Sequence, residues 1–530
     1  MIMKCPQNVL WLLLLFWTAA AVQGSEDPAF DEARKSSEIA GLTLSKVQRW
    51  LHEVALPKIV PDTGLYISHG RGSGRYREAL WNYDDAAADT YPFLFWAAWY
   101  TDCEQINGPI LGVLEAEQRI CNHLDRIPTA VNHKTLEKVV KSKDNLIFAA
   151  SEYVKDGLMA IVEVAGKDNP WFQRMREIQD DIWKHADVET PYGNIPTTNL
   201  EANGEQIQVL VRLFTMTGDR KYLEWAERIA DHYLLGGNFM VNSLRDHGCE
   251  IVGGLGLLLA VESVHNPEKA ERYLPHIRKM LDGIIEKGVN EDGLMYNRLG
   301  NPASGLSDGW GYNYVAFLCH DMVVKEPVYQ DLIQSTLRNL RKPKYRDYPW
   351  ENKSMDGVAD SVEGALYLLN RIPVKEGFAW ANDEVMQRIV MSGDPDRLWS
   401  TYKLESNGVR TALMHALMHT RGLIARPWVQ NLELGAAETD KGLAIVLKSD
   451  QAYEGVLLFD SPRHRNEMGF TRDWPRMNTM PEWFTVELEQ KYVVRIVSKD
   501  SEQTYTGKQL HDGLSIELQA GEEIRLLIAK

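Results

Sequence analysis

Cysteine is scarce in this chain, and negative charge outnumbers positive charge. Five cysteines occur in 530 residues, with no Cys-x-x-Cys pair among them, so neither a structural zinc site nor a disulfide framework is expected to organise the fold. Cys103 and Cys121 could pair across a hairpin, but we expect buried free thiols. Lysine and arginine number 58 against 74 aspartates and glutamates, a net charge of −16, which argues against nucleic-acid binding.

Long uncharged apolar runs are missing except at the start of the chain. Residues 1–24 combine the basic Lys4 with an apolar run from Val9 to Ala21 and small residues ahead of Ser25. This pattern predicts a secretory signal peptide cleaved near Gly24. Its apolar run is short for a membrane span, although an uncleaved anchor is the alternative. We expect an exported protein, periplasmic or extracellular, with no stable membrane span after cleavage.

Several familiar catalytic patterns are missing as well. The sequence contains no serine nucleophile elbow, no His-Glu-x-x-His zinc motif and no dinucleotide fingerprint, which argues against esterases, zinc peptidases and dehydrogenases. Because no metal-ligand pattern is present, we predict no metal site and no required cofactor. A structural calcium ion is compatible with the sequence but has no pattern that identifies it. With 44% hydrophobic residues, the chain can bury a substantial core.

Helical hairpins are the dominant pattern. In residues 199–235 a polar start leads into a helix, a Thr-Gly-Asp turn reverses the chain and a second helix returns. Apolar residues recur at helical spacing on both helices. Related units begin near Trp81, Asp246, Asp308 and Asp356. We predict roughly 12 to 14 helices between residues 30 and 427, mostly antiparallel neighbours, and such a series forms a closed ring or a solenoid.

After Trp428 the pattern changes from helical spacing to short β-type runs. Gly, Asp and Ser residues separate these runs, which predicts an antiparallel sheet or small sandwich. The irregular insert at 461–483 is expected to pack on the helical part or reach its rim. The predicted strands lie at residues 444–447, 455–459, 484–488, 492–497, 514–518 and 524–528.

A signal peptide, serial helical hairpins with polar or aromatic starts, and a β-rich tail together resemble the (α/α) toroid carbohydrate-active enzymes. That group includes the six-hairpin glycosidases and, as neighbours, several toroid polysaccharide lyases. The resemblance implies a mainly α fold. It divides the chain into a signal peptide (1–24), an (α/α)6-type toroid of helical hairpins that carries catalysis (25–428) and a small antiparallel, sandwich-like β domain (429–530). It also implies a carbohydrate substrate, held where the loops at the helix starts form a cleft.

Acidic residues at the helix starts are the candidates for catalysis, because carboxylates can transfer protons to and from a glycosidic bond. Asp89, Asp356 and Glu363 extend these acidic sets. The competing interpretation is local: aspartate at a helix start caps free N–H groups and meets the helix dipole. The candidate catalytic residues are Asp84, Asp85, Glu201, Asp246, His247 and Asp360.

A second group of residues has the side-chain types that bind sugars. Aromatic rings can stack on sugar C–H groups, amides and carboxylates can bind hydroxyls, and arginines can hold a substrate carboxylate or sulfate. Each has a structural alternative, such as a packed core ring, a cap or a solvated loop. The candidate substrate-binding residues are His69, Arg71, Arg75, Trp81, Asn199, Asn203, Glu250, Asp308, Trp310 and Tyr312.

Three main functions fit this sequence, and another carbohydrate reaction such as epimerisation is a further alternative. A glycoside hydrolase would use two carboxylates on an oligosaccharide or polysaccharide, which could be neutral, uronic or sulfated. A polysaccharide lyase would cleave a uronic-acid glycan by β-elimination, with Asn203, His247, Tyr312 and Arg71 as residues of suitable types. A glycan-binding protein without catalysis would keep the aromatic residues but not need paired acids. We predict the hydrolase; the sequence does not specify the sugar, the linkage or the oligomeric state.

Overall fold

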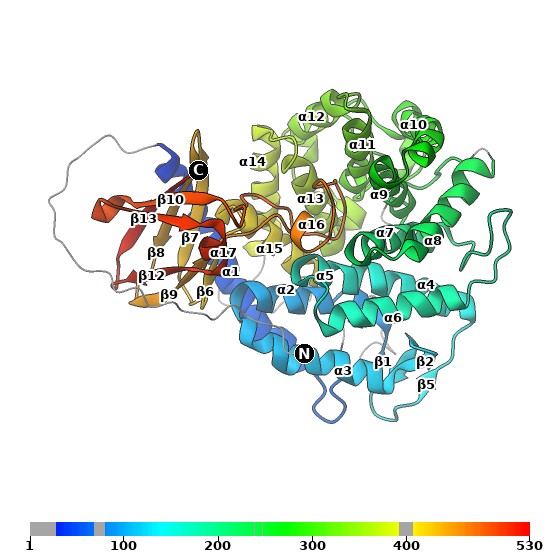
Figure 1. Cartoon of the computed structure of the whole chain (residues 1–530), viewed down its shortest axis with the longest axis horizontal. Helices are drawn as coiled ribbons and strands as arrows, with labels where there is room; N and C mark the ends of the chain where they lie inside the picture. The colour runs from blue at the N-terminus through cyan, green and yellow to red at the C-terminus, as the bar shows by residue number, and fades with distance from the viewer. Residues whose placement is uncertain (1–27, 68–79, 238, 246, 392–405) are drawn as a thin grey trace.

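The computed structural model of the chain describes residues 28–67, 80–237, 239–245, 247–391 and 406–530. Within these residues, seven inner helical segments form a ring and seven outer helices surround it (Figure 1). Consecutive inner segments pack against one another, and the last, α15, closes the ring on the first, α2. The predicted toroid of helical hairpins is therefore confirmed, and its described part comprises seven hairpins.

Each hairpin pairs one outer helix with the inner segment that follows it. The second inner segment is continuous, because a π-helical stretch, η6, joins α4 to α5. The inner segments are α2 (Tyr91–Thr101), α4 (Lys143–Glu152) with η6 (Tyr153–Met159) and α5 (Ala160–Ala165), α7 (Leu200–Thr217), α9 (Glu250–His265), α11 (Trp310–Val324), α13 (Met355–Leu369) and α15 (Ser406–Thr420). The outer helices are α1 (Pro28–Trp50), α3 (Leu111–Ile120), α6 (Pro170–Lys184), α8 (Arg220–Ala230), α10 (Pro267–Gly288), α12 (Gln330–Asn339) and α14 (Lys375–Glu384).

The apolar pattern explains which helices lie inside. The inner α9 is buried on all sides from Glu250 to Glu262, as expected of a helix that neighbours enclose. The outer α8 has one apolar stripe, with Tyr222, Leu223, Ala226 and Ile229 buried, and exposes its charged face. The sequence pattern alone therefore distinguishes the inner helices from the outer ones.

Short turns and small sheets connect these helices. Two small sheets lie within the first two hairpins, in the order β1-β4-β5 and as the pair β2-β3. Their strands are β1 (Leu80–Trp81), β2 (Asn122–Leu124), β3 (Ile127–Pro128), β4 (Ala130–Asn132) and β5 (Lys138–Val139). Strand β1 precedes α2, and β2 to β5 lie between α3 and α4. The remaining helical turns of this part are η1 (Leu51–Ala55), η2 (Leu56–Lys58), η3 (Tyr83–Ala88), η4 (Cys103–Gln105), η5 (Ile106–Ile110), η7 (Asp231–Leu235), η8 (Pro302–Ser304), η9 (Pro343–Tyr345), η10 (Trp350–Lys353) and η11 (Val385–Val390).

The carboxy-terminal part contains two antiparallel sheets, with strand orders β11-β10-β13-β8-β7 and β12-β9-β6. The predicted β domain is confirmed, but the strand expected at 484–488 is wrong, because that segment makes only an isolated bridge between Asp460 and Thr485. The elements are β6 (Ile424–Arg426), β7 (Glu433–Thr439), β8 (Gly442–Lys448), β9 (Tyr453–Leu458), α16 (Arg463–Asn466), β10 (Lys491–Ile496), η12 (Val497–Lys499), β11 (Ser501–Thr506), α17 (Gly507–Asp512), β12 (Leu514–Leu518) and β13 (Glu523–Ala529).

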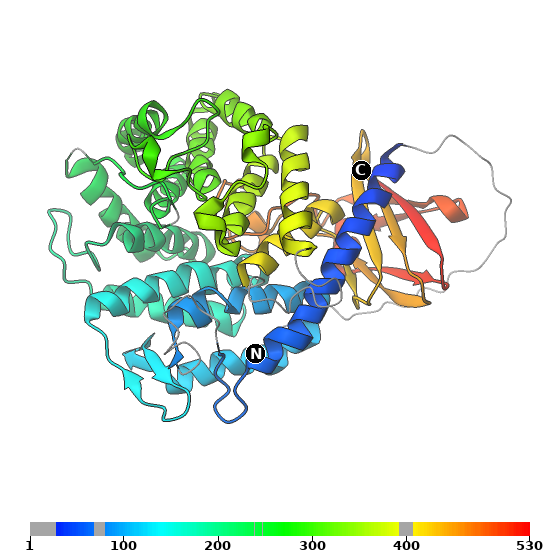
Figure 2. The same cartoon turned by 180° about the vertical axis from the view of Figure 1, so that it is seen from behind.

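Two connections tie the β part to the ring. Helix α1 runs along the larger sheet, as Figure 2 shows, and packs on β7 so closely that a Cβ atom at Gly435 would lie 2.2 Å from the Ser37 nitrogen. The segment 461–483 leaves the β part and enters the far end of the ring, where the Cys319 thiol donates to the Pro475 carbonyl. The insert singled out in the sequence therefore closes one end of the toroid.

Two further expectations concern cysteines and membrane spans. Cys121, Cys249 and Cys319 are buried free thiols, as predicted, so the alternative pairing of Cys103 with Cys121 does not form. Cys103 itself is disulfide-bonded, so the free thiol expected at that position is wrong. No helix in the described parts of the chain is both long and apolar enough to cross a membrane.

Candidate functional site

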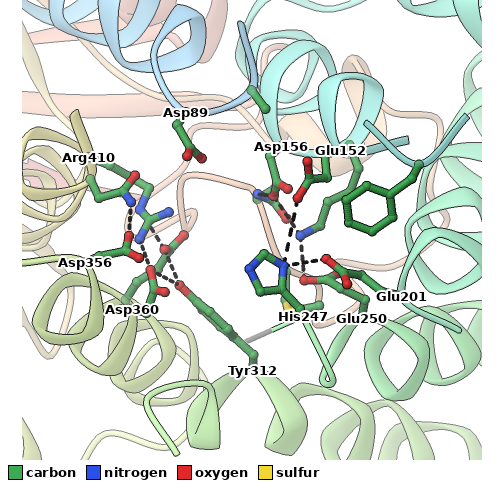
Figure 3. A pocket seen from close by; sticks show the side chains of 17 residues that line it. Asp89, Glu152, Asp156, Glu201, His247, Glu250, Tyr312, Asp356, Asp360 and Arg410 are labelled. Carbon is green, nitrogen blue, oxygen red and sulfur yellow. Dashed lines mark hydrogen bonds and ion pairs between the residues drawn. The ribbon is translucent and has the colours of Figure 1, made fainter. Parts of the chain in front are cut away.

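A polar cavity of about 340 Å³ opens at the end of the ring where the inner helices begin (Figure 3). It is blind, because residues from the segment 461–483 form its floor. Eight carboxylates stand among the residues that line it, so its described wall is strongly acidic. The lining residues are Ala88, Asp89, Phe148, Glu152, Lys155, Asp156, Glu201, His247, Glu250, Tyr312, Asp356, Asp360, Glu363, Asn407, Arg410, Met477 and Asn478.

One wall is built around Arg410 of α15. Its guanidinium makes ion pairs with Asp360 and with Glu363, the second at 2.7 Å. The Tyr312 hydroxyl lies 2.6 Å from Glu363 and 3.2 Å from Asp360, and the Tyr367 hydroxyl contacts the second oxygen of Glu363. Burial raises the pKa of Glu363, and Arg410 opposes that shift. This wall is a rigid network of charges that α11, α13 and α15 hold together.

Asp356 lies one helical turn before Asp360 on α13 and faces the same cavity (Figure 3). Its carboxylate accepts a hydrogen bond from the Asn407 amide, and it is partly exposed. Asp89, which follows η3, lies between the two walls and is exposed. These two carboxylates are more open to a substrate than the buried Asp360 and Glu363.

The opposite wall is built around Lys155 of η6. Its ammonium group lies 2.7 Å from Glu250 and 2.7 Å from Asp156, and it is almost fully buried. Burial alone would lower the pKa of Lys155, but the two carboxylates raise it well above its usual value. Gln208 donates to the second oxygen of Glu250 at 2.6 Å. The lysine therefore stays charged and fixes two carboxylates in place.

A second group on this wall joins Glu201, His247 and Glu152. The Nδ1 atom of His247 contacts Glu201 and lies 3.9 Å from a Glu152 oxygen. One ligand atom from each of the three residues lies within 4.8 Å of the others, so the group could hold a metal ion. The only other such cluster in the described residues joins His464, Asp473 and Glu482.

The floor of the cavity is held by buried charges. Arg476 and Arg212 both make ion pairs with Glu163 of α5, at 2.8 and 2.7 Å, and all three side chains are almost completely buried. Arg212 also donates to the Met477 carbonyl. Burial favours a raised pKa for Glu163, but the two guanidinium groups outweigh it and lower that pKa to about 2. This network fixes the position of Met477 and Asn478 below the cavity.

The structure brings five of the residues predicted for the site to one cavity. They come from α7, the loop before α9, α9 itself, α11 and α13, which lie next to one another in the ring. Predicted candidates that line the cavity are Glu201, His247, Glu250, Tyr312 and Asp360.

Other predicted residues have structural contacts away from the cavity. Trp81 and Trp310 are fully buried, and their indole N–H groups donate to Tyr91 and to Ser361. Asn199 caps α7, where its side chain accepts from the Ala202 N–H. The buried Asn203 donates to the Thr197 carbonyl and the Tyr233 hydroxyl, and the buried Asp308 accepts from the N–H of Gly309. The packed rings of Trp81 and Trp310 and the cap of Asn199 match the structural alternatives weighed in the sequence.

The remaining predicted residues are not placed. His69, Arg71, Arg75 and Asp246 lie outside the described residues, and the side chains of Asp84 and Asp85, within η3, are likewise outside the described ones. Their roles stay predictions from the sequence.

Six polar lining residues were not singled out in the sequence. Glu152, Lys155 and Asp156 belong to one inner segment, and charges within a largely apolar helical run are a detectable signal. Asn407 and Arg410 lie on α15, which packs against α13 and thereby brings them to the cavity. No local pattern marks Asn478, which arrives from the carboxy-terminal part.

No protein-family model matches the chain, and no curated protein does. Several solved structures are similar to it in fold. One is a D-mannose isomerase, at 14% identity and a TM-score of 0.36, over 58% of this chain and 85% of that one. Another is an α-1,6-mannanase from Salegentibacter, at 11% identity and a TM-score of 0.38, over 72% and 99%. A third is a cellobiose 2-epimerase from Spirochaeta thermophila, at 12% identity and a TM-score of 0.36, over 58% and 85%.

The chain is an (α/α) toroid. This fold agrees with the resemblance seen in the sequence, and the observation that supports it is the closed ring of hairpins. What the toroid does depends on the residues that line its cavity, because the same fold hosts many different functions.

Proposed function

We propose that the protein is a carbohydrate-active enzyme, and that it is a glycoside hydrolase acting on an oligosaccharide or polysaccharide. The observation that supports this is a single blind cavity with carboxylates on opposite sides. Glycoside hydrolysis requires one carboxyl group to protonate the leaving oxygen and a second carboxylate to activate water or attack the anomeric carbon. A cavity of about 340 Å³ has room for one or two sugar units of a substrate.

The proposed pair takes one carboxylate from the start of α2 and one from the start of α13. Asp89 supplies the first from the described residues, with Asp84 and Asp85 as the sequence candidates beside it. Asp356 or Asp360 supplies the second, and the Arg410 network holds this wall in one geometry. Fixed charges that need no rearrangement during the reaction are what electrostatic stabilisation of a transition state requires.

The charges of the cavity favour hydrolysis of an uncharged sugar over β-elimination of a uronate. A lyase must neutralise the substrate carboxylate, usually with a cation or an amide. The lysine and the arginine of the described lining, Lys155 and Arg410, each already make ion pairs with two carboxylates. An anionic sugar would therefore meet net negative charge. Export of the enzyme remains our expectation from residues 1–24.

The test is an activity screen on the purified protein. Neutral, uronic and sulfated glycans would be incubated with it. Reducing ends, absorbance and the released sugars would be measured on the same samples. The absorbance would be read near 235 nm, an approximate wavelength for the conjugated uronate that a lyase forms. We expect new reducing ends from a neutral glycan without new absorbance. Absorbance in step with new reducing ends would replace the hydrolase with a lyase, and sugars that change without chain cleavage would indicate isomerisation or epimerisation.

Single substitutions then test the residues. Asp89→Asn, Asp356→Asn and Asp360→Asn should each lower kcat by roughly 10²- to 10⁴-fold, because each removes a carboxylate from the site; Asp84→Asn and Asp85→Asn test the sequence candidates in the same way. The matched control is Glu291→Gln, which changes an exposed carboxylate that pairs with Lys344 and is not among the lining residues of the cavity. Full activity in all five variants would refute this assignment of the catalytic pair.

A further inference from the structure

The cavity has a wall on every side. Each of the seven inner segments, or the residues just before it, contributes at least one lining residue. Because these segments form a closed ring, they surround the cavity in the described part of the chain. A substrate therefore has to enter along the axis of the ring, either through the mouth at the helix starts or through the opposite end.

The opposite end is closed by Met477 and Asn478, which three inner segments hold in place. The Asn478 amide donates to Asp156 of η6 at 2.8 Å, and the Met477 carbonyl accepts from Arg212 of α7 at 2.6 Å. The Met477 side chain packs on α9 so closely that a Cβ atom at Gly253 would lie 2.6 Å from its Cε atom. Contacts on three sides fix this floor, so a glycan chain cannot pass through the ring.

The proposed catalytic carboxylates lie near the mouth, above this floor. Along α13 the exposure falls with depth, because Asp356 is partly exposed whereas Asp360 is 5% and Glu363 1% exposed. Asp356 and Glu363 are about two turns apart, roughly 10 Å along the helix axis. Asp89 is exposed and faces the same cavity (Figure 3). The closed space below the pair belongs to a cavity of about 340 Å³ in all.

Asn478 carries a hydrogen-bond acceptor at the floor. Its φ of 54° lies in the left-handed region, which asparagine tolerates better than most residues. Since its amide nitrogen donates to the Asp156 carboxylate, the orientation of the amide is defined, and the described residues give its Oδ1 atom no hydrogen-bond partner. A buried acceptor is normally paired with a donor from the protein, from water or from a ligand. A sugar hydroxyl is such a donor.

We propose that the enzyme acts at the ends of glycan chains, an inference that rests on the hydrolase function proposed above. The terminal sugar enters the cavity end-on, and one of its hydroxyls donates to Asn478 on the floor. At the level of Asp89 and Asp356, the bond between the anomeric carbon and the glycosidic oxygen breaks, and water supplies the hydroxyl to the carbon and the proton to the oxygen. Each event releases the units below that level, about one or two sugars for a cavity of this size.

Binding of single sugars tests the floor without any cleavage. Glucose, mannose, galactose and xylose would be titrated into the whole protein by calorimetry, and we expect at least one to bind, because a cavity that holds a chain end also accepts the free terminal unit. Asn478→Gly keeps a left-handed backbone but removes the amide, so it should weaken that binding by roughly 3- to 10-fold. The matched control is Asn431→Gly, since Asn431 has a φ of 64° but is exposed and outside the lining; its affinity should be that of the native protein.

The products of cleavage test where the enzyme cuts. Cellohexaose, xylohexaose and mannohexaose, each labelled at the reducing end, and the neutral polysaccharides of the activity screen would be sampled from the earliest times. We expect the same mono- or disaccharide from every chain length, released step by step from one end. In Asn478→Gly the KM should rise by roughly 3- to 10-fold while kcat changes less, a split that partial unfolding would not produce.

The outcomes separate this inference from the hydrolase function. Fragments of mixed length at early times would overturn action at chain ends and leave the hydrolase intact. Recognition at the floor is overturned if none of the single sugars binds, or if Asn478→Gly binds them as tightly as the native protein and Asn431→Gly do. A sugar that binds while no glycan is cleaved would refute the hydrolase and leave the recognition of a terminal unit standing.

Discussion

At the scale of single residues, the cavity is defined by charges that are fixed before any substrate arrives. Arg410 holds Asp360 and Glu363, and Tyr312 adds a hydroxyl to both. A hydrogen bond from Tyr312 stabilises the ionised form of Glu363 and so opposes the effect of burial on its pKa. Tyr312 is thus a positioning residue whose influence should appear in the pH dependence of activity.

Tyr312→Phe should therefore raise the pKa of Glu363. If the ionised Glu363 is needed to hold Arg410, activity is lost as pH falls through its pKa, so the acidic limb of the kcat/KM profile should move to higher pH. The control is Tyr314→Phe on the same helix, because that hydroxyl donates to the Gly293 carbonyl, outside the lining of the cavity. Superimposable acidic limbs for Tyr312→Phe and the native enzyme would contradict this role of Tyr312.

At the scale of elements, glycines set how closely the inner helices approach. A Cβ atom on Gly311 of α11 would lie 2.5 Å from the Gly364 carbonyl carbon, and one on Gly364 of α13 would lie 2.8 Å from the Gly311 Cα. Tyr312 directly follows Gly311 on α11, and Glu363 directly precedes Gly364 on α13. Close approach of these two backbones is what brings the tyrosine hydroxyl to the glutamate.

Gly364→Ala should force α11 and α13 apart. Overpacking of this kind costs about 1–3 kcal/mol, and kcat should fall because Tyr312 loses its contact with Glu363. Gly112→Ala is the control: the added methyl on outer helix α3 meets nothing within 4 Å, and alanine should stabilise that helix by roughly 0.5–1 kcal/mol. Denaturant unfolding and kcat of both variants measure these effects. Equal stabilities of the two variants would show that the glycine contact does not determine the packing.

At the scale of the whole molecule, the β part is needed to complete the ring. Glu163 of α5 lies between Arg212 of α7 and Arg476 of the carboxy-terminal segment. The Thr479 hydroxyl donates to the same carboxylate at 3.0 Å. Removing the partner of a buried charge destabilises a protein far more than removing the partner of an exposed charge. The fold of the toroid and that of its tail should therefore be one cooperative unit.

Arg476→Met tests this coupling. It leaves Glu163 with one guanidinium, and it should lower the free energy of unfolding by about 3–5 kcal/mol. Arg465→Met removes an arginine of the same segment whose ion pair with Glu487 is half exposed, and such pairs contribute about 0–1 kcal/mol. Denaturation curves give both values. A mild effect of Arg476→Met, equal to that of Arg465→Met, would mean that the floor segment does not stabilise the ring.

The same network predicts the response of stability to acid. The pKa of Glu163 is about 2 in the folded protein, below the usual value of 4.5, so its contribution is present above pH 4.5 and is lost as pH falls from about 4.5 towards 2. The contribution at neutral pH is on the order of 3 kcal/mol. Glu163→Gln should be much less stable than the native protein at pH 7, and the difference should shrink near pH 3. Thermal melts across this range would contradict the prediction if the difference stayed constant.

Local patterns were enough to predict the type of fold. Each pattern predicts one element at a time. The helical spacing in residues 199–235 and the β-type runs after Trp428 agree with the helices and strands of the structure. Five candidate site residues also line the cavity, because they stand at or near the starts of inner helices. Trp81 and Trp310 have the same type of position, but their rings turn into the core. The sequence predicts which element carries a residue, but it does not predict the direction in which the side chain points.

The sequence by itself therefore determined the hairpins, the β tail and the acidic starts of the helices, because periodicity and turn chemistry act over a few residues. The tertiary structure decided the rest. The packing of neighbouring inner helices brings Arg410 of α15 to Glu363 of α13, which the Tyr312 hydroxyl of α11 also contacts, and it places Glu205 of α7 near Glu152 of α4. The tertiary structure also places Met477 below residues that lie more than a hundred positions earlier in the chain. These contacts depend on how helices cross and how closely glycines let them approach, which no single element encodes.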